Sequence, residues 1–168
     1  DEWFTNGNFK ASEWVNGSKV DVVAPRWVAD PTNADNGCIE VTTNANPSTP
    51  WDAQFFVSIP GNESPLKEGD KYRLTMKVRA DVAPQTVGSQ SHSRPSEYIH
   101  WDAGVGNINV TGEWVTITTE IITVTHDMSS SDNMRTIAFN LADSTLATNY
   151  YFDDVKIEII SRANLQDP

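Results

Sequence analysis

Apolar and polar residues alternate along several stretches of this chain with a period of two, and helical periodicity is hard to find. The clearest case is Lys71 to Ala80, where apolar residues alternate with basic residues and Thr. Because successive side chains of a strand point to opposite faces, this pattern predicts a strand with one buried and one solvated face. The stretch from Trp114 to Val124 alternates as far as Glu120, after which Ile121 and Ile122 break the phase and predict a bulge or a bend.

Short segments rich in β-branched and aromatic residues recur between clusters of Gly, Pro, Asn, Asp and Ser, which is the pattern of strands and turns. The predicted strands are 7–9, 14–15, 20–24, 38–43, 52–59, 71–80, 86–91, 97–101, 108–110, 114–124, 135–141 and 150–160. Strands spaced in this way predict an all-β protein in which two antiparallel sheets form a β-sandwich. The 168 residues suit a single domain, 1–168, with a polar C-terminal tail from about residue 161.

Charge and composition narrow the range of partners. The formal net charge of -11 opposes binding to nucleic acid, because an acidic protein repels a polyanion. No apolar run approaches the roughly 20 residues of a membrane-spanning helix, so we expect no membrane insertion. The N-terminus lacks the segments of a signal peptide, and we expect the chain to be a mature or excised piece of a longer protein. The single Cys38 excludes an internal disulfide and a multi-cysteine metal site.

Sequence motifs for catalysis are absent. There is no G-x-S-x-G nucleophile elbow, and the three histidines do not have metal-ligand spacing. Acidic residues are plentiful, so a carboxylate pair of the glycosidase kind is not excluded by counting, but many lie in turns such as 30–35. We therefore expect a protein that is not an enzyme, with a small glycan-active hydrolase as the alternative.

Several aromatic side chains are predicted to be partly exposed because their sequence neighbours are polar. Trp27 follows Arg26, Trp51 precedes a segment containing Gln54, and Trp101 is followed by an aspartate. An exposed indole favours a flat partner, and a pyranose ring presents a C–H face while its hydroxyls hydrogen-bond to polar side chains. If two rings each bury roughly 100 Å² at ~25 cal/mol per Å², the gross gain is about 5 kcal/mol, which indicates a modest binder.

The remaining tryptophans are better explained by packing within the fold. We expect Trp3, Trp14 and Trp114 to plug an edge of the sandwich, and among them Trp114 to be a core residue because it starts a strand after a turn. If all the aromatic side chains were internal, the chain would be a structural or adhesive spacer. That is the third interpretation of the sequence.

Six motifs occur in an order and spacing that together are moderately specific: NGNF at 6–9, WDAQFFVSI at 51–59, EGDKYRLTMKVRAD at 68–81, YIHW at 98–101, the stretch 111–124, and YYFDDVKIEI at 150–159. With them the chain resembles carbohydrate-binding modules of the family 4, 9 and 22 group. It is most similar to the xylan-binding modules inserted in family 10 xylanases of gut Bacteroidetes. The resemblance implies a jelly-roll β-sandwich without catalytic activity that binds β-1,4-linked polysaccharide, in particular xylan, in a cleft on a concave face.

The resemblance also implies which residues bind the glycan. They are Trp51 with Gln54, Arg26 and Trp27, an aromatic contact at Tyr98, His100 or Trp101, and Asn140. Alternation places Tyr98 and His100 on one face of the strand and Trp101 on the other. Ile99 shares the face of Trp101. The pattern allows either face to meet the sugar while the other packs in the core.

Members of this group hold a structural calcium between the first and last strands, and the last-strand carboxylate corresponds to Asp153. The acidic residue usual after NGNF is replaced here by Lys10, which places a cation where a ligand is expected. The resemblance further implies a covalently linked glycoside hydrolase and a bacterial protein that is secreted, periplasmic or on the cell surface. We expect the module to be a monomer.

Overall fold

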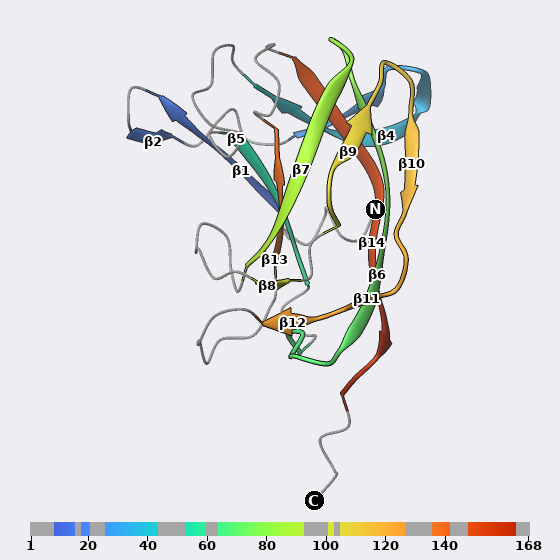
Figure 1. Ribbon diagram of the computed structural model, residues 1–168. Coiled ribbons are helices and arrows are strands. Elements are labelled where there is room, and N and C mark those ends of the chain that lie inside the picture. Colours follow the sequence, from blue (N-terminus) through green and yellow to red (C-terminus); the bar gives the residue numbers. More distant parts are fainter. Residues whose placement is uncertain are drawn as a thin grey trace, which may run out of the picture.

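The computed structural model describes residues 9–15, 18–20, 26–43, 53–59, 64–92, 101–102, 105–126, 136–141 and 148–163, and the regular structure there is entirely β (Figure 1). The strands are β1 (Phe9–Val15), β2 (Ser18–Val20), β3 (Arg26–Asp30), β4 (Asn33–Thr42), β5 (Ala53–Ser58), β6 (Lys71–Ala80), β7 (Gln85–His92), β8 (Trp101–Asp102), β9 (Ile108–Val110), β10 (Val115–Thr118), β11 (Ile122–Thr123), β12 (Thr125–His126), β13 (Thr136–Asn140) and β14 (Asn149–Ser161). None of the described residues forms a helix long and apolar enough to cross a bilayer.

The described strands form two antiparallel sheets. Sheet A has the order β12-β8-β7-β13-β5-β1-β2, with β9 also paired to β7. Sheet B has the order β10-β6-β14-β4-β3, with β11 also paired to β6. The two sheets pack against each other, so the predicted all-β, two-sheet antiparallel sandwich is confirmed (Figure 1).

The core lies between the sheets and is built from alternate residues of their central strands. On β6, every second residue from Tyr72 to Ala80 has 0% exposure, which confirms the alternation predicted for this strand. Phe55 of β5 stacks on Phe152 of β14 with ring centroids 4.4 Å apart. This contact joins sheet A to sheet B at the centre of the sandwich, where burial of aromatic surface contributes most to stability.

The predicted break in the segment from Trp114 to Val124 is confirmed. The structure has β10 and β11 there, both paired to β6, with residues 119–121 between them. At the break, the backbone N–H of Thr119 donates to Leu74 O at 3.0 Å, and its hydroxyl accepts from Leu74 N at 3.0 Å. In a regular ladder a backbone carbonyl oxygen would accept from Leu74 N. Here the Thr119 hydroxyl accepts that hydrogen bond instead.

The β3–β4 hairpin differs from the sequence prediction. We expected a strand only from residue 38 and assigned 30–35 to a turn, whereas β4 begins at Asn33 and β3 precedes it. The prediction was wrong because Asn, Asp and Gly are poor strand residues by propensity. A register shift after Ala29 accommodates the tip of the hairpin.

A buried carboxylate fixes the turn before β6 to the end of β14. Asp70 is 2% exposed and accepts hydrogen bonds from the backbone N–H groups of Lys67 at 2.8 Å and Ala163 at 2.6 Å. Its second oxygen also accepts from Arg162 Nη1 at 3.2 Å. Arg162 also donates hydrogen bonds to the carbonyl oxygens of Pro65 at 2.8 Å and residue 64 at 2.9 Å. The motif EGD therefore has a structural role in this fold.

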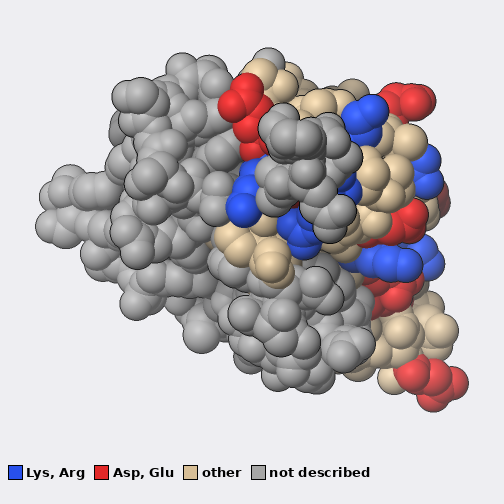
Figure 2. All heavy atoms as spheres, turned by 90° about the horizontal axis from the view of Figure 1, so that it is seen from below, with Lys and Arg blue, Asp and Glu red and all other residues tan. Residues whose placement is uncertain are grey.

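Basic and acidic side chains are interspersed on the described part of the surface seen from below (Figure 2). Two of the ion pairs on sheet B are Lys77 with Asp154 at 3.3 Å and Lys156 with Glu158 at 3.9 Å. All four side chains are more than a third exposed, so each pair contributes little to stability.

Candidate functional site

Two of the predicted sugar-binding residues meet on sheet A. Gln54 of β5 and Asn140 of β13 lie directly opposite each other in the strand register. Gln54 Nε2 donates to Asn140 Oδ1 at 2.9 Å, and the two residues are 6% and 7% exposed. Their neighbours Phe55 and Phe139 belong to the core, so the alternation of each strand points the amides away from sheet B.

The rest of this face of sheet A is closed where the structure describes its side chains. Phe56, Ala138 and Thr136 lie on the same face by alternation, and each is 0% exposed. Asn140 is also opposite Gly88 of β7, which has no side chain. The amide pair is therefore a polar group at the margin of a closed face, reached by solvent over a small area.

Three other predicted residues cannot be placed in this site from the structure. Trp51, Tyr98 and His100 lie outside the described residues. Of Trp101 only the backbone is described, and it pairs with Ser91 of β7 and His126 of β12. Its strand β8 is separated from β13 by β7, so its backbone belongs to the sheet that carries the amide pair.

Arg26 and Trp27 lie on the other sheet. They begin β3, the edge strand of sheet B, where they pair with Glu40 and Ile39 of β4. The Trp27 side chain is 41% exposed, as its polar sequence neighbours predicted. Its ring atoms Cε3 and Cζ3 are 3.3 Å from the position that a Cβ on Gly37 would occupy. The structure thus divides the predicted binding residues between two sheets.

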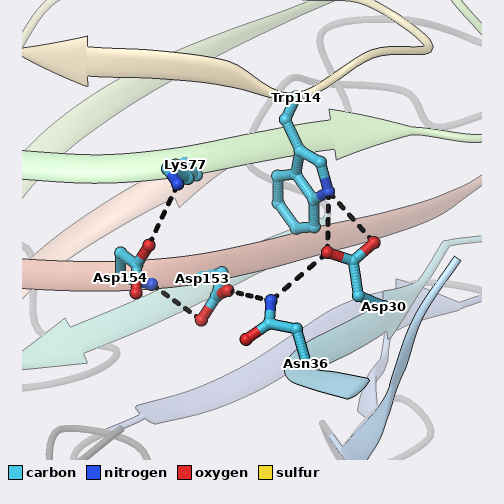
Figure 3. A network of polar contacts seen from close by, with 6 residues as sticks. All are labelled: Asp30, Asn36, Lys77, Trp114, Asp153 and Asp154. Carbon is cyan, nitrogen blue, oxygen red and sulfur yellow. Dashed lines mark hydrogen bonds and ion pairs between the residues drawn. The ribbon is translucent and has the colours of Figure 1, made fainter. Parts of the chain in front are cut away.

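A network of polar contacts on sheet B was missed by sequence analysis (Figure 3). Asp30, at the end of β3, accepts from Thr32 N and Thr32 Oγ1, both at 2.7 Å, and Trp114 Nε1 is 3.1 Å from each carboxylate oxygen. The Asn36 amide bridges two carboxylates, donating to Asp30 at 3.2 Å and to Asp153 at 2.8 Å. The hairpin, the segment before β10 and strand β14 meet in this way.

The network fixes the hairpin across the outer face of sheet B. Trp114 precedes β10 at one edge of the sheet and Asp30 ends β3 at the other, so their hydrogen bond links the two edges. Our expectation that Trp114 is a core residue was wrong, because it is only partly buried and bonds to Asp30 outside the core. An indole N–H requires an acceptor when it is buried, and the carboxylate supplies one. The expectation for Trp3 falls outside the described residues, and of Trp14 only the backbone is described.

The same network determines the ionisation of its members. Burial raises the pKa of Asp30, but hydrogen bonds from Thr32, Trp114 and Asn36 outweigh it and lower that pKa to about 2. The Cys38 thiol is fully buried, and burial together with the charges of Asp30 and Asp153 raises its pKa to about 12. Asp30 is therefore not a general acid near neutral pH, and Cys38 is not a reactive thiol.

The surroundings of Asp153 do not favour a metal ion. One of its oxygens accepts from Asn36 Nδ2 at 2.8 Å and the other from the backbone N–H of Asp154 at 2.9 Å. Calcium is held by several oxygens, whereas the neighbours here are N–H donors. Among the described residues no group of three or more His, Cys, Asp and Glu side chains is arranged to hold a metal. Calcium binding stays a prediction.

The sequence contained only part of the signal for this network. An aspartate two residues before Thr32 is a common way to bond a turn, because its side chain reaches the backbone N–H two residues on. Nothing local indicates the contacts with Trp114 and Asp153, which lie 84 residues from Asp30 and 117 residues from Asn36 respectively.

No protein-family model matches this sequence, and no curated protein matches it. Solved structures do. A family 4 carbohydrate-binding module (CBM4) has a TM-score of 0.57 and 18% identity, covering 91% of this chain and 95% of its own. The N-terminal cellulose-binding domain of β-1,4-glucanase C from Cellulomonas fimi has a TM-score of 0.55 and 18% identity, covering 93% and 91%.

Two further solved structures are similar in fold. The family 11 carbohydrate-binding module from Clostridium thermocellum, solved with a β-1,3-1,4-mixed-linked tetrasaccharide, has a TM-score of 0.54 and 16% identity, covering 93% of this chain and 91% of its own. A tailspike protein of bacteriophage CBA120 has a TM-score of 0.58 and 15% identity, but the match covers only 20% of that chain. This chain has the β-sandwich fold found in carbohydrate-binding modules of families 4 and 11.

Proposed function

We propose that this chain is a non-catalytic carbohydrate-binding module and that Gln54 and Asn140 contact the glycan. The observation that carries the proposal is the hydrogen-bonded amide pair on adjacent strands of sheet A, at two positions that the family resemblance implies for glycan binding. The likeness in fold to modules of families 4 and 11 supports it.

The chemistry of the pair suits a sugar. The mutual bond occupies one N–H of Gln54 and the carbonyl oxygen of Asn140. The Gln54 carbonyl oxygen and the Asn140 amide nitrogen are then an acceptor and a donor for adjacent hydroxyls of one pyranose ring. Because both residues are at least nine-tenths buried, a ligand that fails to match them leaves buried polar atoms unpaired, at a cost of about 1–3 kcal/mol each.

We propose a β-1,4-linked polysaccharide as the ligand, with xylan as the first candidate from the sequence motifs. Neutral glycans suit a chain with a net charge of -11. Two of the similar structures are described as binding cellulose and a mixed-linkage tetrasaccharide, so glucans are the comparison ligands. In this proposal the module is monomeric, part of a secreted or cell-surface bacterial glycoside hydrolase, and brings that enzyme to its substrate.

Affinity electrophoresis in gels containing xylan, hydroxyethylcellulose or mixed-linkage glucan tests the proposal. We expect retardation without release of sugar, and at least tenfold weaker binding for Gln54→Ala and Asn140→Ala. Thr118→Ala, an exposed position on sheet B, is the control and should bind normally. Release of reducing sugar would indicate a hydrolase, and unretarded migration in all three gels would indicate a spacer.

The sequence prediction for Trp51 is tested in the same gels. Trp51→Ala should weaken binding at least tenfold while leaving the thermal midpoint nearly unchanged. A large drop in the midpoint with unchanged binding would identify Trp51 as a core residue instead.

A further inference from the structure

The β3–β4 hairpin presents an exposed indole on a backbone cradle. Trp27 is 41% exposed, which makes it one of the few large apolar side chains in the described regions with more than a third of its surface accessible. Its ring lies against Gly37 of β4, so close that a Cβ there would stand 3.3 Å from two ring carbons. Because residue 37 has no side chain, the ring can lie directly against the strand. The part of the ring that does not contact the strand is exposed to solvent.

Side-chain hydrogen bonds anchor the hairpin that carries this ring. Asp30 is three residues after Trp27 and bonds to Trp114 across sheet B. Asn36 immediately precedes Gly37, and its amide is fixed between Asp30 and Asp153. Asp30 is therefore linked to the opposite edge of sheet B, and Asn36 is linked to the central strand β14. A platform fixed before the ligand arrives loses little conformational entropy on binding.

The polar side chains of the hairpin favour a neutral polar ligand. Residues 31–37 of the hairpin are all exposed, and Asn33 and Asp35 supply an amide and a carboxylate at its tip, six and eight residues after Trp27. Such groups hydrogen-bond to hydroxyls, and the acidic side chain disfavours an anion. The combination of a flat apolar ring and neighbouring polar groups matches a pyranose ring of an uncharged glycan.

We propose that Trp27, resting on Gly37, is a second sugar-stacking platform separate from the amide pair. Gln54 and Asn140 point away from sheet B, whereas Trp27 belongs to the edge strand of sheet B. The platform takes a second segment of the same neutral polysaccharide. This inference rests on the proposed function. Two weak sites on one module strengthen binding to a long chain much more than binding to a short oligosaccharide.

Binding of polymer and of tetrasaccharide to three variants tests the platform. Trp27→Ala should raise the dissociation constant for soluble polysaccharide about tenfold, because the stacking area and the second contact are lost. Trp27→Tyr, which keeps a flat ring, should raise it less than about threefold. Ile121→Ala removes an apolar side chain that is 47% exposed between β10 and β11, and it should bind as the wild type does. All three should keep the wild-type affinity for tetrasaccharide at the amide pair.

NMR of the wild-type protein provides a measurement that does not depend on a variant. The indole Nε1–H resonance of Trp27, identified by its absence in Trp27→Ala, should shift during titration with cellotetraose or xylotetraose. The inference is overturned if this resonance is unmoved at saturation while the side-chain amide signals of Gln54 and Asn140 shift. It is also overturned if Trp27→Ala binds polymer like the wild type.

A double variant separates failure of this inference from failure of the proposed function. Gln54→Ala combined with Asn140→Ala should abolish tetrasaccharide binding at the amide pair and leave the Trp27 shift in place. If that double variant binds normally while Trp27→Ala does not, the amide pair is not the site and the platform stands. If the wild type binds none of the polysaccharides, both proposals fail.

Discussion

Replacing Asp30 with Asn should destabilise the protein by about 2 kcal/mol at neutral pH. The carboxylate is 7% exposed and accepts hydrogen bonds on both oxygens, from Thr32, Asn36 and Trp114. An asparagine offers one acceptor oxygen and would direct its own N–H groups at these donors. The pKa of Asp30 is about 2 in the folded protein against an ordinary value of 3.8, and this difference corresponds to about 2 kcal/mol.

The pH dependence of this effect has a definite sign. Because the folded-state pKa is lowered, the charged form is favoured in the folded protein, and the stabilisation is fully present well above pH 3.8. It is lost as the pH falls through the folded value of about 2, and linkage leaves about half of it at pH 3. Wild-type and Asp30→Asn proteins should therefore differ most above about pH 5 and converge towards pH 2.

Urea unfolding at several pH values, followed by tryptophan fluorescence, measures this difference. Asp154→Asn is the matched control, because Asp154 pairs with Lys77 at a site where both side chains are more than 40% exposed. That change should cost no more than about 1 kcal/mol. A gap between wild type and Asp30→Asn that is as large at pH 2.5 as at pH 7 would refute the assignment of a low pKa to Asp30.

The remaining predictions concern the core, the turn before β6 and the hairpin. Phe55→Ala should cost about 3–5 kcal/mol in urea unfolding, because a fully buried ring that joins the two sheets is removed; a loss under about 1 kcal/mol would argue against that contact. Asp70→Ala should cost about 2–4 kcal/mol by leaving two backbone N–H groups without their acceptor and Arg162 without its ion-pair partner, and a thermal midpoint within about 2 °C of the wild type would contradict this role. Gly37→Ala should cost less than about 1 kcal/mol, because the partly exposed Trp27 ring needs to move only slightly; a loss above about 2 kcal/mol would mean that the ring cannot shift.

Local sequence patterns predicted β6 and β9 with their observed bounds. In β6 the alternation spans ten residues, and every second side chain is fully buried. Such a strand can be predicted without knowing which strands it pairs with, because a half-buried sheet position selects apolar residues at a period of two. The break between β10 and β11 was predicted for the same reason, since a change of phase in the pattern forces a change in the chain.

The β3–β4 hairpin could not be predicted in this way. Its tip is rich in Asn and Asp, and local propensity assigns such residues to turns. Contacts with Trp114 and Asp153 overrule that preference by giving Asp30 and Asn36 partners from distant parts of the chain. The position of Trp114 was missed for the same reason, because nothing near it in sequence indicates an acceptor outside the core.

For the candidate site, the family resemblance implied Gln54, Asn140 and Trp27 as polar or aromatic residues suited to a sugar. The strand alternation around Gln54 correctly implies that it faces away from the core, because Phe55 and Val57 face into it. That Gln54 and Asn140 touch, 86 residues apart, follows only from the pairing of β5 with β13. That Trp27 lies on the opposite sheet follows only from the pairing of β3 with β4.

The amino-acid sequence by itself determined the class of the fold, the strands with regular alternation, and the residue types that suit a glycan. These properties depend on residues that are close to one another in sequence. Burial of one face of a strand requires apolar residues at every second position, and this requirement is visible in the local sequence pattern. The tertiary structure alone decided which polar groups became partners and on which sheet the exposed Trp27 lies. A hydrogen bond between side chains more than eighty residues apart depends on how strands pair across a sheet, and no local pattern encodes that pairing.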